Sequence, residues 1–163
     1  RLLLHYAVMW GAGQEVVAAL LQANPDATSK VDRLDQRLPL HHAVASQAAP
    51  EVVALLLQVY RGATRMGDEY KRTPLHITSQ NSNSWTARML VEAKADVHAR
   101  DVHLMTPMHR AAGNGDSGTV RVLVEANADV HARDKNNRTP LYWATLYDSK
   151  EAIQVLRELG ATE

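Results

Sequence analysis

Apolar residues along this chain come in pairs that lie one helical turn apart. Val16-Val17 is followed by Leu20-Leu21, and Val52-Val53 is followed by Leu56-Leu57. Near the end of the chain, Ala152-Ile153 precedes Leu156 in the same manner. Apolar residues at this spacing fall on one face of an α-helix. The pattern therefore predicts a series of amphipathic helices, each of which buries one face.

A second pattern predicts a shorter helix ahead of each amphipathic one. Thr-Pro-Leu-His or a close variant of it occurs at residues 2–5, 38–41, 73–76, 106–109 and 139–142. Threonine suits the position before a helix because its hydroxyl caps free amides, and proline suits the first helical position. Leu2 and Leu38 replace this threonine. We expect these two helix starts to be weaker by roughly 1 kcal/mol each.

The spacing of these patterns is regular. Residues 91–101 and 124–134 agree at ten of eleven positions and lie 33 residues apart, the same period as the last three Thr-Pro motifs. A fixed period of this length predicts a stack of repeats in which each unit contacts its neighbours, with no central cleft. We expect five units, at residues 1–31, 32–67, 68–100, 101–133 and 134–163, that form a single array. The chain starts inside a unit and without methionine, so we interpret it as a fragment of a longer chain.

These motifs resemble the ankyrin repeat. Thr73-Pro74-Leu75-His76 and the Ala-Asp-Val-His-Ala-Arg-Asp stretch at 95–101 are similar to that family's two best-known segments, and the resemblance covers essentially the whole chain. It implies an all-α solenoid of helix-turn-helix units with short β-hairpin-like fingers. It also implies that the first helices and the fingers line a concave face, where members of the family usually bind other proteins.

Two departures from the family pattern bear on the geometry. Units one and two carry an extra residue between their helices and another after the second helix, so the array joins two repeat subtypes. The finger glycine, which takes a left-handed conformation without steric cost, is absent from all four fingers. Of the aligned residues, only asparagine tolerates that conformation well, which leaves the finger geometry open, most of all at Leu104. The aligned residues are Gln36, Lys71, Leu104 and Asn137.

Composition argues against several classes of function. Lys plus Arg and Asp plus Glu both number 18, whereas nucleic-acid and membrane-surface binders usually carry a basic excess. No apolar run is long enough to span a membrane, so we expect no membrane insertion. The chain has no cysteine, which excludes disulfides and suits an intracellular, reducing compartment such as the cytoplasm.

The repeat phase also argues against a metal site and catalysis. His5, His41, His76 and His109 hold the same slot in successive units. The resemblance gives that slot a structural role, with the ring hydrogen-bonded to the finger backbone and the capping threonine. Stacked helices lie about 8–10 Å apart, too far for equivalent histidines to share one ion. The acids are repeat-phased as well, so we expect no metal, no cofactor and no enzyme activity in this segment.

The first helices and one finger supply the candidate binding residues. The slot after each Leu-His pair, which should point toward the concave side, holds Tyr6, His42, Ile77, Arg110 and Trp143. Trp10 and Tyr147 lie further along the same surface, and tryptophan, tyrosine and arginine are enriched at binding hot spots. Tyr6 and Trp10 serve equally well to cover an end of the stack. The finger residues His103, Leu104 and Met105 are unusually apolar for an exposed turn, which indicates an interaction site or local packing.

These observations predict a non-catalytic module that binds another protein on its concave face and fingers. The alternatives are a permanent structural or linker subunit of a larger assembly, or the targeting arm of an enzyme whose catalytic domain lies outside this segment. The protein would act as a monomer or as a subunit of a hetero-complex. Trp85, in a second helix at a slot that the family usually leaves polar, marks either a contact on the convex side or a shield for the 81–84 turn.

Overall fold

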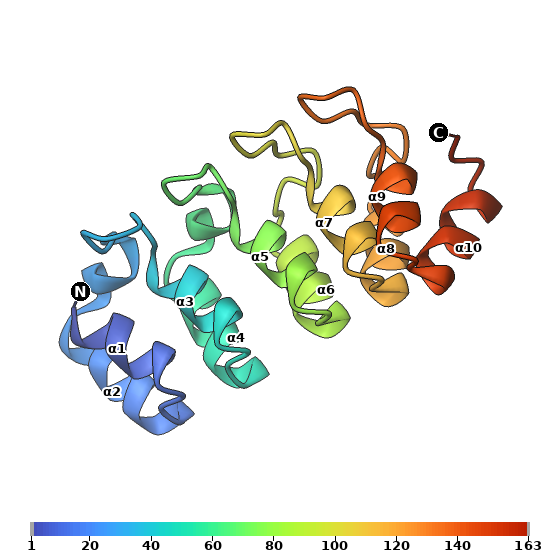
Figure 1. Ribbon diagram of the computed structural model, residues 1–163. Coiled ribbons are helices and arrows are strands. Elements are labelled where there is room, and N and C mark those ends of the chain that lie inside the picture. The colour runs from blue at the N-terminus through green and yellow to red at the C-terminus, as the bar shows by residue number, and fades with distance from the viewer. Residues whose placement is uncertain (1, 163) are drawn as a thin grey trace.

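The protein is a curved stack of helix pairs, with a row of loops projecting from one edge (Figure 1). The computed structural model describes residues 2–162 and contains ten α-helices over that range. The first helices of the pairs are α1 (Leu3–Met9), α3 (Pro39–Ala45), α5 (Pro74–Gln80), α7 (Pro107–Gly113) and α9 (Pro140–Leu146). The second helices are α2 (Gln14–Ala23), α4 (Pro50–Val59), α6 (Ser84–Glu92), α8 (Ser117–Glu125) and α10 (Lys150–Glu158).

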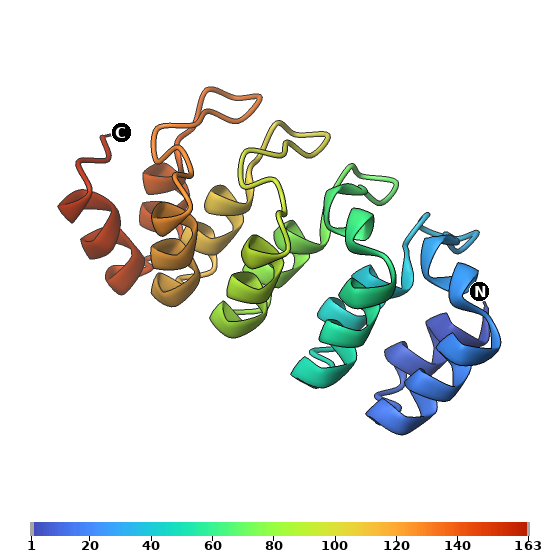
Figure 2. The same cartoon turned by 180° about the vertical axis from the view of Figure 1, so that it is seen from behind.

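The helices form two layers. Each first helix contacts the first helices of the neighbouring pairs, each second helix contacts the neighbouring second helices, and the layers meet within every pair. Figure 2 shows the same stack from the side of the second helices. We call the surface made by the first helices and the projecting loops the first-helix face, and the opposite surface the second-helix face. No helix within residues 2–162 is both long and apolar enough to cross a membrane.

The core lies between the two layers. Fully buried side chains at equivalent positions of successive first helices face fully buried side chains of the second helices. Burial of each such side chain contributes about 1.5–3 kcal/mol, so every pair depends on its neighbours to cover its apolar face. In the first layer these residues are Leu4, Leu40, Leu75, Met108 and Leu141, and in the second layer Val17, Val53, Leu90, Leu123 and Leu156.

The first helices begin where the Thr-Pro pattern predicts. Proline occupies the first turn of α3, α5, α7 and α9, and the residue before each helix has extended backbone. The Thr139 hydroxyl accepts a hydrogen bond from the Tyr142 backbone N–H at 3.2 Å. The Thr73 and Thr106 hydroxyls instead lie 2.9 Å from Nδ1 of His76 and His109. A histidine ring therefore completes the cap wherever both residues of the motif are present.

The second helices end in two different ways, as the two repeat subtypes predict. α2 and α4 continue into short 3₁₀ helices at Pro25–Ser29 and Arg61–Arg65. α6, α8 and α10 are followed instead by a residue with positive φ, which reverses the chain at once. Those residues are Lys94, Asn127 and Gly160, with φ of 67°, 62° and 79°. The first two helix pairs thus differ from the others in the turn that follows the second helix.

The projecting loops, which we call fingers, are tight turns, and no strand is assigned to them within residues 2–162. In the finger at residues 101–105, the Asp101 N–H donates to the Met105 carbonyl at 3.0 Å, and the Leu104 N–H donates to the Asp101 carbonyl at 2.9 Å. The four residues at the missing glycine all adopt the left-handed conformation despite their side chains. Gln36, Lys71, Leu104 and Asn137 have φ of 53°, 59°, 57° and 63°.

Successive fingers are joined by single backbone hydrogen bonds at a constant register. The Glu69 N–H donates to the Asp35 carbonyl at 3.0 Å, Val102 to Tyr70 at 3.0 Å, and Lys135 to His103 at 2.9 Å. These bonds satisfy amides at the exposed edge and hold each finger against the one before it. The fingers therefore form a continuous row along one edge of the stack (Figure 1).

Candidate functional site

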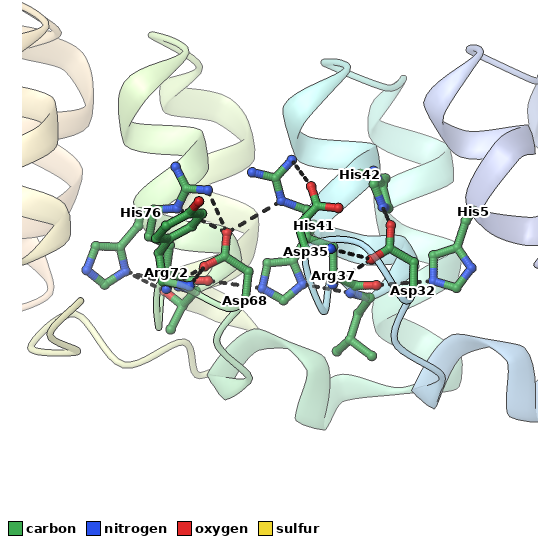
Figure 3. A network of polar contacts seen from close by, with 12 residues as sticks. His5, Asp32, Asp35, Arg37, His41, His42, Asp68, Arg72 and His76 are labelled. Carbon is green, nitrogen blue, oxygen red and sulfur yellow. Dashed lines mark hydrogen bonds and ion pairs between the residues drawn. The ribbon is translucent and has the colours of Figure 1, made fainter. Parts of the chain in front are cut away.

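In α1, α3, α5 and α7, a histidine links its own helix start to the next finger through its two ring nitrogens (Figure 3). His76 Nδ1 accepts from the Thr73 N–H at 3.2 Å, and its Nε2 lies 3.0 Å from the Met105 carbonyl in the next finger. His41 makes the same pair of contacts with the Leu38 N–H and the Arg72 carbonyl. Because a carbonyl can only accept, Nε2 carries the proton and the ring is neutral. The predicted contacts of this slot with the finger backbone and the capping threonine are confirmed.

Burial favours the same neutral form. The four rings of this slot are fully buried. Desolvation lowers the pKa of His41 and of His76 to about 4, and it also lowers the pKa of His5 and of His109. Both nitrogens of each ring are engaged by the protein, which leaves none for a metal. Within residues 2–162 no three His, Asp or Glu side chains are placed to share an ion.

A buried aspartate at the start of each finger anchors that finger. Asp101 Oδ1 accepts from the His103 and Met105 N–H groups at 2.8 and 3.0 Å, and Asp134 binds the equivalent amides of its finger. Burial acts to raise the pKa of these two carboxyls, but hydrogen bonds from the finger and from Arg110 or Arg138 outweigh it and lower the pKa. Both are therefore carboxylates at neutral pH.

The slot that the sequence assigned to partner binding also reaches this aspartate. Arg110 donates to Asp101 Oδ2 at 2.5 Å, Trp143 Nε1 donates to Asp134 Oδ2 at 3.0 Å, and His42 Nε2 lies 3.0 Å from Asp32 Oδ2. Three units thus use chemically different side chains for one contact at one position. The repeat phase of the acids is visible in the sequence, but their contact with this slot is not.

Three of the predicted binding residues lie inside the fold instead of on an open surface. His42, Ile77 and Met105 are 4%, 5% and 6% exposed. Ile77 belongs to α5, which has a first helix packed on each side, so its side chain is covered by neighbouring units. His42 is covered by Asp32 and lies near the His5 ring, at 5.6 Å between ring centroids. The expectation that His42 and Ile77 point to an open surface is therefore wrong, and for Met105 the burial fits the alternative of local packing.

The remaining candidates are accessible. Tyr6, Leu104 and Tyr147 are 45%, 45% and 61% exposed, Trp10 is 80% exposed, and His103 is exposed at its finger tip. Tyr6 and Trp10 lie in the first pair, far along the stack from Tyr147 (Figure 1). The accessible candidates therefore do not form one patch.

One hollow of about 330 Å³ opens on the first-helix face between α7 and α9. Its lining joins aromatic, basic and amide side chains with the backbone of a glycine. The residues are Gln80, Met105, His109, Arg110, Gly113, Asn114, Trp143 and Tyr147. Arg110 Nε is buried there and makes no hydrogen bond to any described residue. The hollow therefore offers an aromatic wall beside a largely buried guanidinium.

The aromatic wall is built by three residues, and its full extent was not evident from the sequence. Trp143 stacks on Tyr147 with ring centroids 6.0 Å apart and an interplanar angle of 20°. The Arg138 guanidinium covers the Trp143 ring at 4.3 Å from its centroid. Arg138 also donates to Asp134, so one finger residue fixes both the carboxylate and the indole. The sequence signal for this cation–π contact was a basic residue five positions before a tryptophan.

Comparison with known proteins agrees with the repeat pattern. Residues 4–101 and 101–162 match the family model for ankyrin repeats, which contains three copies of the repeat. A search of curated proteins gave no match.

Proposed function

The chain belongs to the ankyrin-repeat family, and we propose that it binds a partner protein on its first-helix face, the face expected to be concave, with the hollow between α7 and α9 as the central contact. Ankyrin repeats are generally protein–protein interaction modules. Tyr147, Trp143 and Arg110 are of the residue types most enriched at hot spots, and they converge on one hollow. That convergence is the observation that carries the proposal.

The chemistry of the hollow is that of recognition. Its side chains offer stacking, hydrogen-bond donation and shape, and the Arg110 and Trp143 donors are directed to buried carboxylates. The catalytic role of a base or nucleophile would need a titratable group free to exchange protons with substrate. His109, the one histidine in the lining, has both ring nitrogens engaged by the backbone. The proposal is therefore a non-catalytic module.

The test is site-specific crosslinking. A photo-crosslinking phenylalanine analogue at position 147 should yield a covalent adduct with the partner in cells, whereas the same analogue at the exposed Glu51 of α4 should not. Adding Arg110→Ala to the position-147 protein should reduce the yield. Equal adducts from both positions, or adducts at position 51 alone, would contradict binding at this hollow.

The first pair supports a second candidate, a permanent subunit of a larger assembly. Leu3 and Trp10 are 75% and 80% exposed, and a hollow of about 230 Å³ beside Leu2 and Leu20 is almost wholly apolar. Exposed apolar clusters of this kind mark contact surfaces. A monodisperse monomer in light scattering would favour the transient module over the permanent subunit.

A further inference from the structure

The second residue of each second helix shows an unexplained exception. Glu15, Glu51 and Glu151 hold this position in α2, α4 and α10, where a negative charge is favourable near a helix N-terminus. α6 has Trp85 there instead. Its side chain is 63% exposed and makes no hydrogen bond or ring contact with any described residue. Neither packing nor capping accounts for a tryptophan at this position.

The next unit has a glycine at the same position, Gly118 in α8. A Cβ there would lie 3.2 Å from the Cβ and Oγ of Ser84, so α6 and α8 approach closely at this end. Beside the glycine is a hollow of about 300 Å³. Its lining is Ser84, Trp85, Arg88, Gly118, Arg121, Val122 and Glu125. An exposed indole and a position without a side chain therefore face one another across two neighbouring units.

The hollow continues as a furrow between the two helices. It shares Arg88, Val122 and Glu125 with a second hollow of about 210 Å³, which extends toward Glu92 and Ala126. α6 has 9 residues, which at about 1.5 Å per residue span roughly 13 Å. A strand rises about 3.3 Å per residue, so the furrow accommodates about four residues of extended chain.

The charges along the furrow are not uniform. At the Trp85 end, Arg88 and Arg121 face one acid, Glu125, whereas further along Arg88 lies with two acids, Glu92 and Glu125. Arg88 donates to Glu125 at 2.9 Å. Arg121 is 61% exposed and its nearest acid, Glu158, is 4.0 Å away, so its charge is largely free. The end that carries the indole thus favours a carboxylate.

We propose that the α6–α8 furrow on the second-helix face binds an extended peptide segment of a second protein, with a large apolar side chain against Trp85 and a carboxylate on Arg121. The apolar side chain would occupy the hollow lined by Trp85, Gly118 and Val122. The exposed Arg88–Glu125 pair contributes little to stability and can rearrange to admit the peptide. This surface is opposite the proposed first-helix site, so one molecule would hold two partners at once.

The test is an NMR titration of the whole chain with three blocked hexapeptides, GGFEGG, GGFKGG and GGAEGG. GGFEGG should shift the Trp85 indole N–H signal and the amide signals of α6 and α8. The lysine and alanine peptides should bind more weakly. Trp85→Glu introduces the residue that α2, α4 and α10 carry at the same position. It should weaken GGFEGG binding by about tenfold or more. Arg121→Glu should reverse the preference toward GGFKGG, and Glu51→Ala, at an exposed residue of α4, should leave the affinity for GGFEGG unchanged.

Several results would overturn the proposal. These are equal shifts from all three peptides, shifts confined to the first-helix face, or no shift at millimolar peptide. Self-association that Trp85→Glu abolishes would show that a second copy of this chain occupies the furrow. Since the peptides and the Trp85 and Arg121 variants probe α6 and α8 alone, failure here leaves the crosslinking test at position 147 unaffected.

Discussion

At the scale of single residues, the fold depends on buried polar groups that each have one acceptable protonation state. The histidine rings of the first helices must be neutral, with the proton on Nε2, because each lies between an N–H donor and a carbonyl. The finger aspartates must be ionised, because each accepts several N–H bonds. Protonation of a ring removes the Nδ1 acceptor of the N–H at its helix start, and protonation of an aspartate weakens the bonds that hold its finger.

We therefore predict that acid destabilises the protein well before its carboxylates titrate. The folded pKa of His41 and of His76 is about 4, below the ordinary value of 6.5, so the unfolded chain binds more protons between these values. The contribution of these two histidines to the free energy of unfolding is then fully present above about pH 6.5, and it is lost as the pH drops toward 4. Thermal melts from pH 8 to pH 4 measure this. His98→Gln, at an exposed histidine, should leave the profile unchanged, and a flat profile in the wild type would contradict the assignment.

Trp143 should behave as both a structural and a binding residue. Trp143→Phe retains a ring next to Tyr147 but removes the N–H that donates a hydrogen bond to Asp134. We therefore expect the free energy of unfolding to fall by about 1 kcal/mol. Tyr147→Ala removes an exposed side chain and should change stability by less than about 0.5 kcal/mol. Urea unfolding separates the two. If Trp143→Phe has no effect, the hydrogen bond to Asp134 is not a stabilising contact.

At the scale of elements, the finger is held by hydrogen bonds among its own residues and by one bond to the preceding finger. Leu104 adopts φ of 57°, a conformation that costs roughly 1–2 kcal/mol for residues with a Cβ. The carboxylate of Asp101, the turn bond from Leu104 and the bond from Val102 to the preceding finger together impose it. The finger thus stores strain that its hydrogen bonds offset.

Leu104→Gly should relieve this strain. Glycine in an unfolded chain has extra freedom, which offsets about 0.5–1 kcal/mol of the gain, so we expect stabilisation by up to about 1 kcal/mol in chemical unfolding. Leu104→Ala is the matched control, since it removes the same exposed side chain while keeping the Cβ. Equal effects of the two variants would show that φ is not the determining factor.

Much of this architecture could be predicted from the sequence. The helix pairs and the proline starts follow from motifs that act within a few residues of themselves. The histidine contacts reach the next finger, and they are what the resemblance to the ankyrin repeat implies. The left-handed conformation of Gln36 and Leu104 could not be predicted, because residues with a Cβ rarely adopt it and the hydrogen bonds that impose it form only in the folded finger. The burial of Ile77 was missed for a related reason: its position on the helix is known from the sequence, but its covering comes from the units on either side.

At the scale of the whole array, the first and last helix pairs within residues 2–162 each contact one neighbouring pair, whereas the middle pairs contact two. α1 packs on α2 and α3, whereas α5 and α7 each lie between two first helices. The first unit also starts without a capping hydroxyl, at Leu2. Repeat arrays gain much of their stability from interfaces between units. A unit with one interface therefore has lower local stability than a unit with two.

Hydrogen exchange should therefore be fastest in residues 2–24 and slowest in α5 and α7. Exchange followed by mass spectrometry at neutral pH reports this gradient, because amides in a unit that opens alone exchange faster than those that need global unfolding. Leu2→Thr supplies the missing hydroxyl at an exposed position and should slow exchange in α1. Uniform protection along the stack would show that the array unfolds as one cooperative unit.

The constant register of the finger bonds bears on how the number of repeats in the gene can change. Residues 99–101 and 132–134 are both Ala-Arg-Asp, and the bond from Val102 to Tyr70 has the same form as the bond from Lys135 to His103. Removal of residues 101–133 would join Arg100 to Asp134 and recreate a junction of the same sequence, with a donor and a carbonyl again facing across it. A gene with such an array can gain or lose one whole unit by unequal recombination without a new interface having to evolve.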